Sequence, residues 1–490
     1  MTGPSPAAEL KRRMRMPQRH RLLHGYPLAA AMHPADAISP DHAVAFGRSK
    51  SKLLVGVLPH PFCNPAVTGC GFCVFPHEPG NSARSAPIVK SVIQEMERTV
   101  TGQMQLLQRE VASLYFGGGT ANMTEPLAFR ELCEVLAVGF DFRQAEVTLE
   151  GVPAYFLRGD PRLLDVMLAK LQARHVRISM GVQTFDESRL KEMGRGAFGT
   201  PATFREVVEY AHSLGFTVSG DLLFNLPGQM LDQMKDDVSR AVEIGLDHIG
   251  LYHLVLFRGL GTPWAADDDM LAELPDNERA CENWLALREM LFGLGFYQTS
   301  LTNFERVKFR DTPERYRYEE DSFRPNRYEA IGFGPSAISY AATPDFSHAI
   351  KTMNPTSSAE YTAAVATGKR VWNKVFVYRT HDQKVLWLTR RLAALNIDRG
   401  VYRQLFDTNP EDDFAAEFAA FADAGLVTTT ADAIRPTPKG MFYADSIAAV
   451  WASRAIQLNR DLGPAAVGRD APAALLHDSR ENNAGHSPMG

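Results

Sequence analysis

Three of the five cysteines in this 490-residue chain lie within eleven residues of one another, at Cys63, Cys70 and Cys73. Five cysteines are too few for a disulfide scaffold in a chain of this length. Clustered thiolates are typical of a metal centre, and two kinds fit the spacing. A structural zinc ion takes four ligands, so it would need His60 or His77 as the fourth. A [4Fe–4S] cluster held by three thiolates would leave one iron open for a substrate.

Other residues suited to ligand binding follow predicted strands. The consecutive glycines Gly117 to Gly119 allow a close backbone approach to a ligand, or form a tight turn without one. Asp221 lies within an apolar strand, where a carboxylate needs a partner or a ligand. Glu150 ends another strand and would bind a ribose or an ammonium group, or be solvated. Successive strands thus deliver polar groups to one rim, where we also expect Gln183 and Arg195.

The elements that position these residues alternate short apolar runs with amphipathic helical patterns. The predicted strands are Leu53–Leu58, Ala112–Phe116, Glu146–Glu150, Val176–Val182, Thr217–Phe224 and His248–Leu254. The predicted helices are Val89–Leu107, Pro126–Val138, Pro161–Gln172, Pro201–Leu214 and Gln229–Ile244. Such alternation indicates an α/β fold with a parallel sheet covered by helices. Six repeats favour a partial (β/α)6 barrel over a closed barrel of eight strands.

The rest of the chain divides by composition around this barrel. We predict an irregular basic leader over residues 1–50, the barrel over 51–256 and a barrel-closing, substrate-binding region over 257–375. A small helical module over 376–455 contains a helix that leads into a hairpin, as in a winged helix. Residues 456–490 are rich in Gly, Pro, Ala and Asn, and we expect them to be disordered.

The overall composition excludes several classes of protein. A net charge of −5 is small for 490 residues, so nothing indicates a nucleic-acid partner or an acidic membrane surface. Residues 410–432 of the helical module carry six acidic residues and no Lys or Arg, which is unsuited to DNA. Residues 1–25 lack an apolar central stretch, and the apolar runs are too short to cross a bilayer. We therefore expect a monomeric, cytoplasmic protein.

Seven motifs in order resemble those of the radical S-adenosylmethionine superfamily, and more closely the branch typified by oxygen-independent coproporphyrinogen III oxidase. The motifs are Pro61-Phe-Cys, Cys70-Gly-Phe-Cys, Phe116-Gly-Gly-Gly-Thr, Thr148-Leu-Glu, Gly181-Val-Gln-Thr-Phe, Asp221-Leu-Leu-Phe-Asn-Leu-Pro-Gly and Gly332-Phe-Gly-Pro-Ser-Ala-Ile-Ser. The resemblance covers about Gly56 to Tyr340. It implies a radical S-adenosylmethionine barrel that generates a 5′-deoxyadenosyl radical, a small-molecule substrate, and an electron donor of the flavodoxin or ferredoxin type.

The resemblance also implies roles for individual positions. The cluster would be ligated by Cys63, Cys70 and Cys73. The S-adenosylmethionine on the open iron would contact Gly118, Glu150 and Ile338. A second S-adenosylmethionine, which lies beside the first in the oxidase type, would be held by Phe72, Gly119, Thr120, Gln183, Arg195 and Asp221.

Two positions depart from the family pattern. Six residues separate Cys63 from Cys70, whereas the family has three, and Val57 stands where the oxidase has a tyrosine that contacts the cofactor. The related haem-chaperone branch carries a His-Asn…Tyr-Trp motif. The comparable region here, Pro313-Glu-Arg-Tyr-Arg-Tyr-Glu-Glu, has no histidine.

Three functions compete on these grounds. The matched second site favours a radical C-methyltransferase or a cyclopropane-forming enzyme that uses a second S-adenosylmethionine as donor. Oxidative decarboxylation of coproporphyrinogen III or another tetrapyrrole reaction is the alternative, in which the basic leader would pair with propionates or be a solvated arm. Non-enzymatic binding of haem or a cluster is the third.

Overall fold

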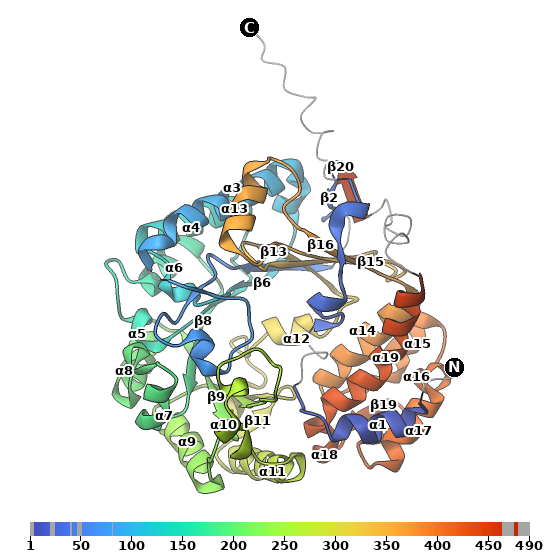
Figure 1. Ribbon diagram of the computed structural model, residues 1–490. Helices are drawn as coiled ribbons and strands as arrows, with labels where there is room; N and C mark the ends of the chain where they lie inside the picture. The colour runs from blue at the N-terminus through green and yellow to red at the C-terminus, as the bar shows by residue number, and fades with distance from the viewer. Residues whose placement is uncertain are drawn as a thin grey trace.

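The computed structural model describes residues 4–19, 25–39, 42–46, 51–80, 82–462 and 475–478. Its centre is a curved parallel sheet with helices on the outer side (Figure 1). Six of its strands correspond to the six predicted ones: β3 (Lys52–Val57), β6 (Val111–Phe116), β7 (Glu146–Gly151), β8 (His175–Gln183), β9 (Thr217–Phe224) and β10 (His248–His253). They are neighbours in chain order and all parallel, which confirms the predicted partial barrel.

The outer helices also follow the apolar periodicity of the sequence. Strand connections and outer cover come from α3 (Ala86–Gly102), α4 (Pro126–Gly139), α5 (Pro153–Phe156), α6 (Leu163–Leu171), α7 (Glu187–Glu192), α8 (Pro201–Ser213) and α9 (Leu231–Glu243). Pro126 and Pro201 stand in the first turn of their helices, where proline's missing N–H is harmless. The buried sides of these helices and the strands form one continuous apolar core.

The barrel-closing region extends the sheet at both edges. A seventh parallel strand, β13 (Tyr328–Phe333), pairs with β3 and was not predicted, because no strand–helix repeat precedes it. Antiparallel strands follow beyond it: β14 (Ile338–Ala342), β15 (Ala349–Met353), β16 (Lys374–Tyr378) and β1 (His33–Pro34). At the other edge β10 pairs with β12 (Asn303–Arg306), which pairs with β11 (Phe296–Gln298). The helices of this region are α10 (Asp268–Ala272), α11 (Asn277–Gly293), α12 (Tyr318–Ser322) and α13 (Ser358–Ala366).

The C-terminal module is winged-helix-like, as the sequence predicts. Its helices are α14 (Thr380–Ala393), α15 (Arg399–Phe406), α16 (Pro410–Asp413), α17 (Ala415–Asp423), α18 (Pro438–Phe442) and α19 (Ala444–Leu462). Its small sheet has the order β17 (Ile397–Asp398), β19 (Ala433–Pro436) and β18 (Val427–Thr429). The predicted boundary at residue 376 falls inside β16, so the barrel sheet ends slightly later than the composition indicates.

The N-terminal leader is not irregular, which corrects the sequence prediction. It contains α1 (Pro6–Met14), which packs on α17 and α19 of the C-terminal module (Figure 1). Ser5 caps this helix by accepting a hydrogen bond from Ala8 N. Glu9 pairs with two of the arginines within the helix, so part of the basic charge is neutralised locally. Local pairing of this kind is hidden in a composition count.

The predicted disordered tail, 456–490, lies mostly outside the described residues. Its described parts are ordered, because α19 runs to Leu462 and β20 (Leu476–Asp478) pairs with β2 (His42–Val44). Within the described part of the chain, no helix is long and apolar enough to span a membrane.

A buried carboxylate ties helix α3 to the turn that follows β13. Glu95 accepts hydrogen bonds from Gly334 N (2.9 Å), the Tyr361 hydroxyl (2.6 Å) and Asn354 Nδ2 (2.8 Å). Burial raises the pKa of Glu95 to about 7, although these hydrogen bonds oppose the shift. The turn at Gly334 is therefore held by the carboxyl group of Glu95, whose protonated form is favoured by burial.

We predict that this carboxyl makes stability fall with rising pH. The folded pKa of Glu95, about 7, lies above the ordinary 4.5, so the folded state holds the proton over that interval. The free energy of unfolding of the wild type should therefore fall, relative to Glu95→Gln, by up to about 3 kcal/mol between these pH values. Thermal unfolding midpoints across this range measure the difference. Glu97→Gln, at an exposed position on the same helix, is the control, and parallel wild-type and Glu95→Gln profiles would contradict the prediction.

Candidate functional site

The barrel encloses a cavity of about 390 Å³ that opens among the loops at the carboxyl ends of its strands. Side chains two residues apart on a strand point to the same side, and alternate positions of β8, β9 and β10 line this cavity. Eleven of the twelve predicted site residues are among its lining residues: Cys63, Cys70, Phe72, Cys73, Gly118, Gly119, Thr120, Glu150, Gln183, Arg195 and Asp221. The sequence motifs therefore converge on one site.

Ile338 is the predicted site residue that the structure does not bring to this cavity. It begins β14, pairs with Met353, and is 43% exposed. The two histidines considered as zinc ligands also differ in position. His77 lines the cavity, whereas His60 is fully buried and its Nδ1 accepts a hydrogen bond from Phe62 N. Val57, at the position of the family tyrosine, is buried within the sheet.

Cys63 ends β4 (Phe62–Cys63), and Cys70 and Cys73 lie on the loop that turns sharply between β4 and β5 (Glu78–Pro79). Cys70 has a φ of 51°, in the left-handed region that non-glycine residues seldom adopt. Hydrogen-bond donors point at two of the sulfurs. Thr120 Oγ1 lies 3.2 Å from Cys63 Sγ, and Arg195 lies 3.5 Å from Cys70 Sγ. Donors of this kind stabilise thiolates and tune the potential of metal-bound sulfur.

Asn64 organises the six residues that separate Cys63 from Cys70, and the sequence reasoning missed it. Its side-chain oxygen accepts hydrogen bonds from the backbone of Ala66 (2.9 Å) and Val67 (3.4 Å). Its Nδ2 donates to the carbonyl oxygens of Met193 (3.1 Å) and Gly194 (3.3 Å). The lengthened loop is thereby fixed to the segment that leads to Arg195.

An apolar cluster supports the loop from the other side. Phe72 lies against Trp264, with ring centroids 5.7 Å apart, and a Cβ at Gly71 would collide with the same indole. Trp264 belongs to a cluster with Leu223, Leu226, Leu254 and Leu256. Residues after β9 and β10 therefore hold the cysteine loop in place.

The thiols are desolvated and close enough to influence one another. Burial raises the pKa of Cys63, and raises the pKa of Cys73 to about 11. The neighbouring thiols and Glu150 add to the shift at Cys73. A bound cation, such as a metal centre supplies, would favour the thiolate forms of Cys63 and Cys73 in this environment.

The glycine run meets the cysteine loop directly. Gly118 has a φ of 115°, which other residues rarely adopt. A Cβ at Gly119 would collide with the carbonyl oxygens of Pro61 and Phe62. At Gly117, the nearest atoms to an added Cβ belong to Tyr115 and Glu150. The run therefore permits close packing of two loops as well as access for a ligand.

Two carboxyl groups face the cavity and resist ionisation. Burial raises the pKa of Glu150 to about 7, with a partly opposing hydrogen bond from Tyr115. Burial also raises the pKa of Asp221 to about 7, and repulsion from Glu150 adds to the shift, while Arg177 and Arg195 oppose it. Among the described residues, no hydrogen bond to the Asp221 carboxylate is found. A cationic ligand would favour the ionised form of both acids.

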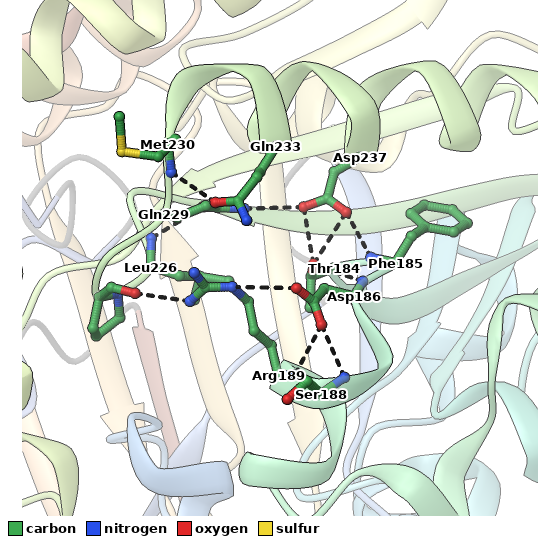
Figure 2. Close-up of polar contacts among 11 residues, drawn as sticks. Thr184, Phe185, Asp186, Ser188, Arg189, Leu226, Gln229, Met230, Gln233 and Asp237 are labelled. Carbon is green, nitrogen blue, oxygen red and sulfur yellow. Dashed lines mark hydrogen bonds and ion pairs between the residues drawn. The ribbon is translucent and has the colours of Figure 1, made fainter.

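Asp237 fixes the loop that follows Gln183 (Figure 2). This buried residue of α9 accepts hydrogen bonds from Thr184 Oγ1 (2.9 Å to one oxygen, 3.0 Å to the other), Phe185 N (2.6 Å) and Gln229 Nε2 (3.1 Å). Gln229 in turn accepts from Leu226 N at 3.1 Å. The loops after β8 and β9 are therefore joined through one carboxylate outside the cavity.

The floor of the cavity consists of residues that sequence reasoning missed. The segment around α12 contributes Tyr316 and Glu319 to the cavity lining, and Tyr318 stacks on Tyr115 at 4.8 Å between centroids. Glu319 accepts hydrogen bonds from Asn303 Nδ2 (2.6 Å) and Ser300 Oγ (2.9 Å). Alternation along β8, β9 and β10 would have placed Arg177, Ser179, Ser219, His248 and Tyr252 on the inside as well.

Comparisons with known proteins agree with this geometry. Residues 57–241 match the family model of the radical SAM superfamily. The heme chaperone HemW of Lactococcus lactis is 23% identical, over 79% of this chain and 94% of its own length. Anaerobilin synthase of Escherichia coli O157:H7 is 24% identical, over 79% of this chain and 81% of its own length. The structure of coproporphyrinogen III oxidase from Escherichia coli superposes with a TM-score of 0.68 at 20% identity, over 83% of this chain and 92% of that one.

We predict that Gly119→Ala destabilises the protein, because the added methyl group would press on two backbone carbonyls that cannot rotate away. Overpacking of this kind costs about 1–3 kcal/mol. Gly196→Ala is the matched control, since nothing lies within 4 Å of a Cβ there. Unfolding midpoints of the two variants measure the effect. Equal midpoints would show that the glycine run and the cysteine loop are not closely packed.

Proposed function

We propose that this chain is a member of the radical SAM superfamily, in the coproporphyrinogen III oxidase-like branch, and that it cleaves S-adenosylmethionine reductively to act on a small-molecule substrate. Its cofactors are those of the superfamily, a [4Fe–4S] cluster and S-adenosylmethionine. When bound, they supply the one-electron chemistry and the 5′-deoxyadenosyl radical.

One observation carries the proposal: the three thiols, the glycine run and Glu150 line a single cavity. Cys63, Cys70 and Cys73 would hold the cluster, and the three-thiolate set leaves one iron for the methionine end of S-adenosylmethionine. Thr120 and Arg195 donate hydrogen bonds toward two of the sulfurs. Gly118 leaves room beside the cluster, and Glu150 would accept hydrogen bonds from the cofactor.

The chain's other task is to exclude water and fix geometry. The Asn64 contacts fix the cysteine loop, and Tyr115, which stacks on Tyr318, lines the cavity together with Tyr316 and Glu319. These contacts would limit the access of water to a bound cofactor.

We further infer that a second S-adenosylmethionine binds in the same cavity. All six residues that match the second-site pattern line it: Phe72, Gly119, Thr120, Gln183, Arg195 and Asp221. The Asp221 carboxylate has no hydrogen bond among the described residues and would be ionised by a cationic ligand. A second molecule would act as methyl or methylene donor, which supports a radical C-methyltransferase or cyclopropane-forming reaction.

A tetrapyrrole reaction is the second candidate, and a separate cavity favours it. A space of about 1120 Å³ lies between α1, the segment 253–278 and the C-terminal module. Leu10, Met14 and Leu256 contribute apolar walls, and Lys11 and Arg15 contribute cations that would pair with propionates, beside the acids Asp276, Glu278 and Asp423. The relatives named heme chaperone and anaerobilin synthase point to the same class of ligand.

Anaerobic reconstitution tests the central proposal. With iron, sulfide, dithionite and S-adenosylmethionine, the wild type should form 5′-deoxyadenosine, measured by mass spectrometry, while Cys70→Ala should form none because the cluster loses a ligand. Cys133→Ala, at a buried position away from the cavity, is the matched control and should retain activity. A reconstituted cluster that binds S-adenosylmethionine without cleaving it would instead favour a binding protein. Zinc binding without an iron–sulfur chromophore would contradict the proposal.

Asp221→Asn tests the second site. Equilibrium binding of radiolabelled S-adenosylmethionine to the cluster-loaded wild type should saturate at two molecules per chain. The variant should bind about one, because the amide cannot pair with a cationic group. S-adenosylhomocysteine or methylthioadenosine should fall more than 5′-deoxyadenosine. Unchanged stoichiometry would contradict the assigned role of Asp221 in the second site, and decarboxylated coproporphyrinogen as the product would favour the tetrapyrrole reaction.

A further inference from the structure

The floor of the cavity carries an arginine that has no carboxylate partner. Arg177 is 3% exposed and lines the cavity, and its guanidinium lies 3.6 Å from the centre of the Tyr316 ring. Its Nε is buried without a hydrogen-bond partner. Among the described residues no carboxylate forms an ion pair with it. A guanidinium buried in this way is costly unless something pairs with it.

A second unpaired donor lies beside it. His248 is 3% exposed and also lines the cavity. Its Nδ1 lies 2.7 Å from Ser219 Oγ and 3.4 Å from Arg177 Nη2. Because a guanidinium only donates, Nδ1 accepts, and the proton of the neutral ring lies on Nε2. His248 Nε2 has no hydrogen-bond partner either.

The acids near Arg177 are already engaged by other groups. Glu146 accepts a hydrogen bond from Arg317 N at 2.9 Å. Glu305 accepts from Tyr316 N at 2.8 Å, and Glu319 accepts from Asn303 at 2.6 Å. Burial raises the pKa of all three carboxyls, which reduces their negative charge at the floor. The charge of Arg177 favours the ionised form of all three acids and of Asp221, but among the described residues none of these carboxylates occupies its N–H groups, which are left for a ligand.

We propose that Arg177 and His248 form a subsite that binds a carboxylate group of the substrate, deep in the barrel below the radical-generating site. A guanidinium with free N–H groups suits a carboxylate in both charge and geometry. The second buried N–H donor, on the imidazole, would complete the recognition. The substrate would enter with its carboxylate first and present its reacting carbon toward the rim. This assignment depends on the proposed function, because it places the substrate under the radical.

Propionate and propionamide are matched probes, since they differ in charge but hardly in shape. Ligand-observed NMR titration of the full-length, cluster-loaded protein would measure both dissociation constants. We expect propionate to bind at least about tenfold more tightly than propionamide, the difference that one charged hydrogen bond provides. Arg177→Met should abolish this preference. Arg177→Lys, which keeps the charge but loses the Nε donor, should retain part of it.

Arg158→Met is the matched control. Arg158 also lies over a tyrosine ring, 4.6 Å from the centre of Tyr155, but it is exposed and outside the cavity lining. This variant should bind propionate like the wild type. Equal binding of the two probes, or propionate binding that survives in both Arg177 variants, would overturn the subsite.

The same preparations separate this inference from the proposed function. Formation of 5′-deoxyadenosine without selective propionate binding would overturn the subsite alone. Selective propionate binding without any cleavage of S-adenosylmethionine would overturn the proposed reaction and leave a carboxylate-binding cavity.

Discussion

The close approach of two backbone segments controls the site. The glycine run after β6 lies against the carbonyl groups of Pro61 and Phe62, directly before the first cysteine. No side chain fits between them, so the position of Cys63 is set by the sheet rather than by its own flexible loop. Thr120, the next residue, then reaches the Cys63 sulfur. The contacts of Asn64 and Trp264 then position the rest of the cysteine loop relative to Cys63.

Contacts within the cysteine loop explain how the barrel accommodates the longer spacing between Cys63 and Cys70. Asn64 accepts a hydrogen bond from the backbone within the loop and donates to the carbonyl oxygens of Met193 and Gly194, so the longer loop is anchored to that segment. Arg195, which follows that segment, reaches Cys70. The buried side-chain amide of Asn64 therefore fixes the longer loop in place on the barrel. The three thiols can line one cavity although their spacing differs from the family pattern.

Sequence reasoning predicted the six strands and the rim residues because both follow local rules. Apolar periodicity fixes strands, and polar residues at strand ends converge wherever strands are parallel. Asn64 was missed because its partners are about 130 residues away in the chain. Arg177 and His248 were missed because they lie near the starts of their strands, far from the rim that the motifs mark. The strand β13 and the inserted segment around Tyr316 belong to no repeat, so nothing in the local pattern placed them.

The charged residues of the cavity are distributed unevenly between its rim and its floor. Near the rim, burial raises the pKa values of Glu150 and Asp221, and repulsion from Glu150 adds to the shift at Asp221. Such a region favours a cationic ligand, and S-adenosylmethionine carries both a sulfonium and an ammonium group. At the floor the order is reversed, since the neighbouring acids are hydrogen-bonded while Arg177 lacks a paired anion. A molecule with a carboxylate at one end would therefore bind with that end at Arg177 and its other end beneath the cationic cofactor.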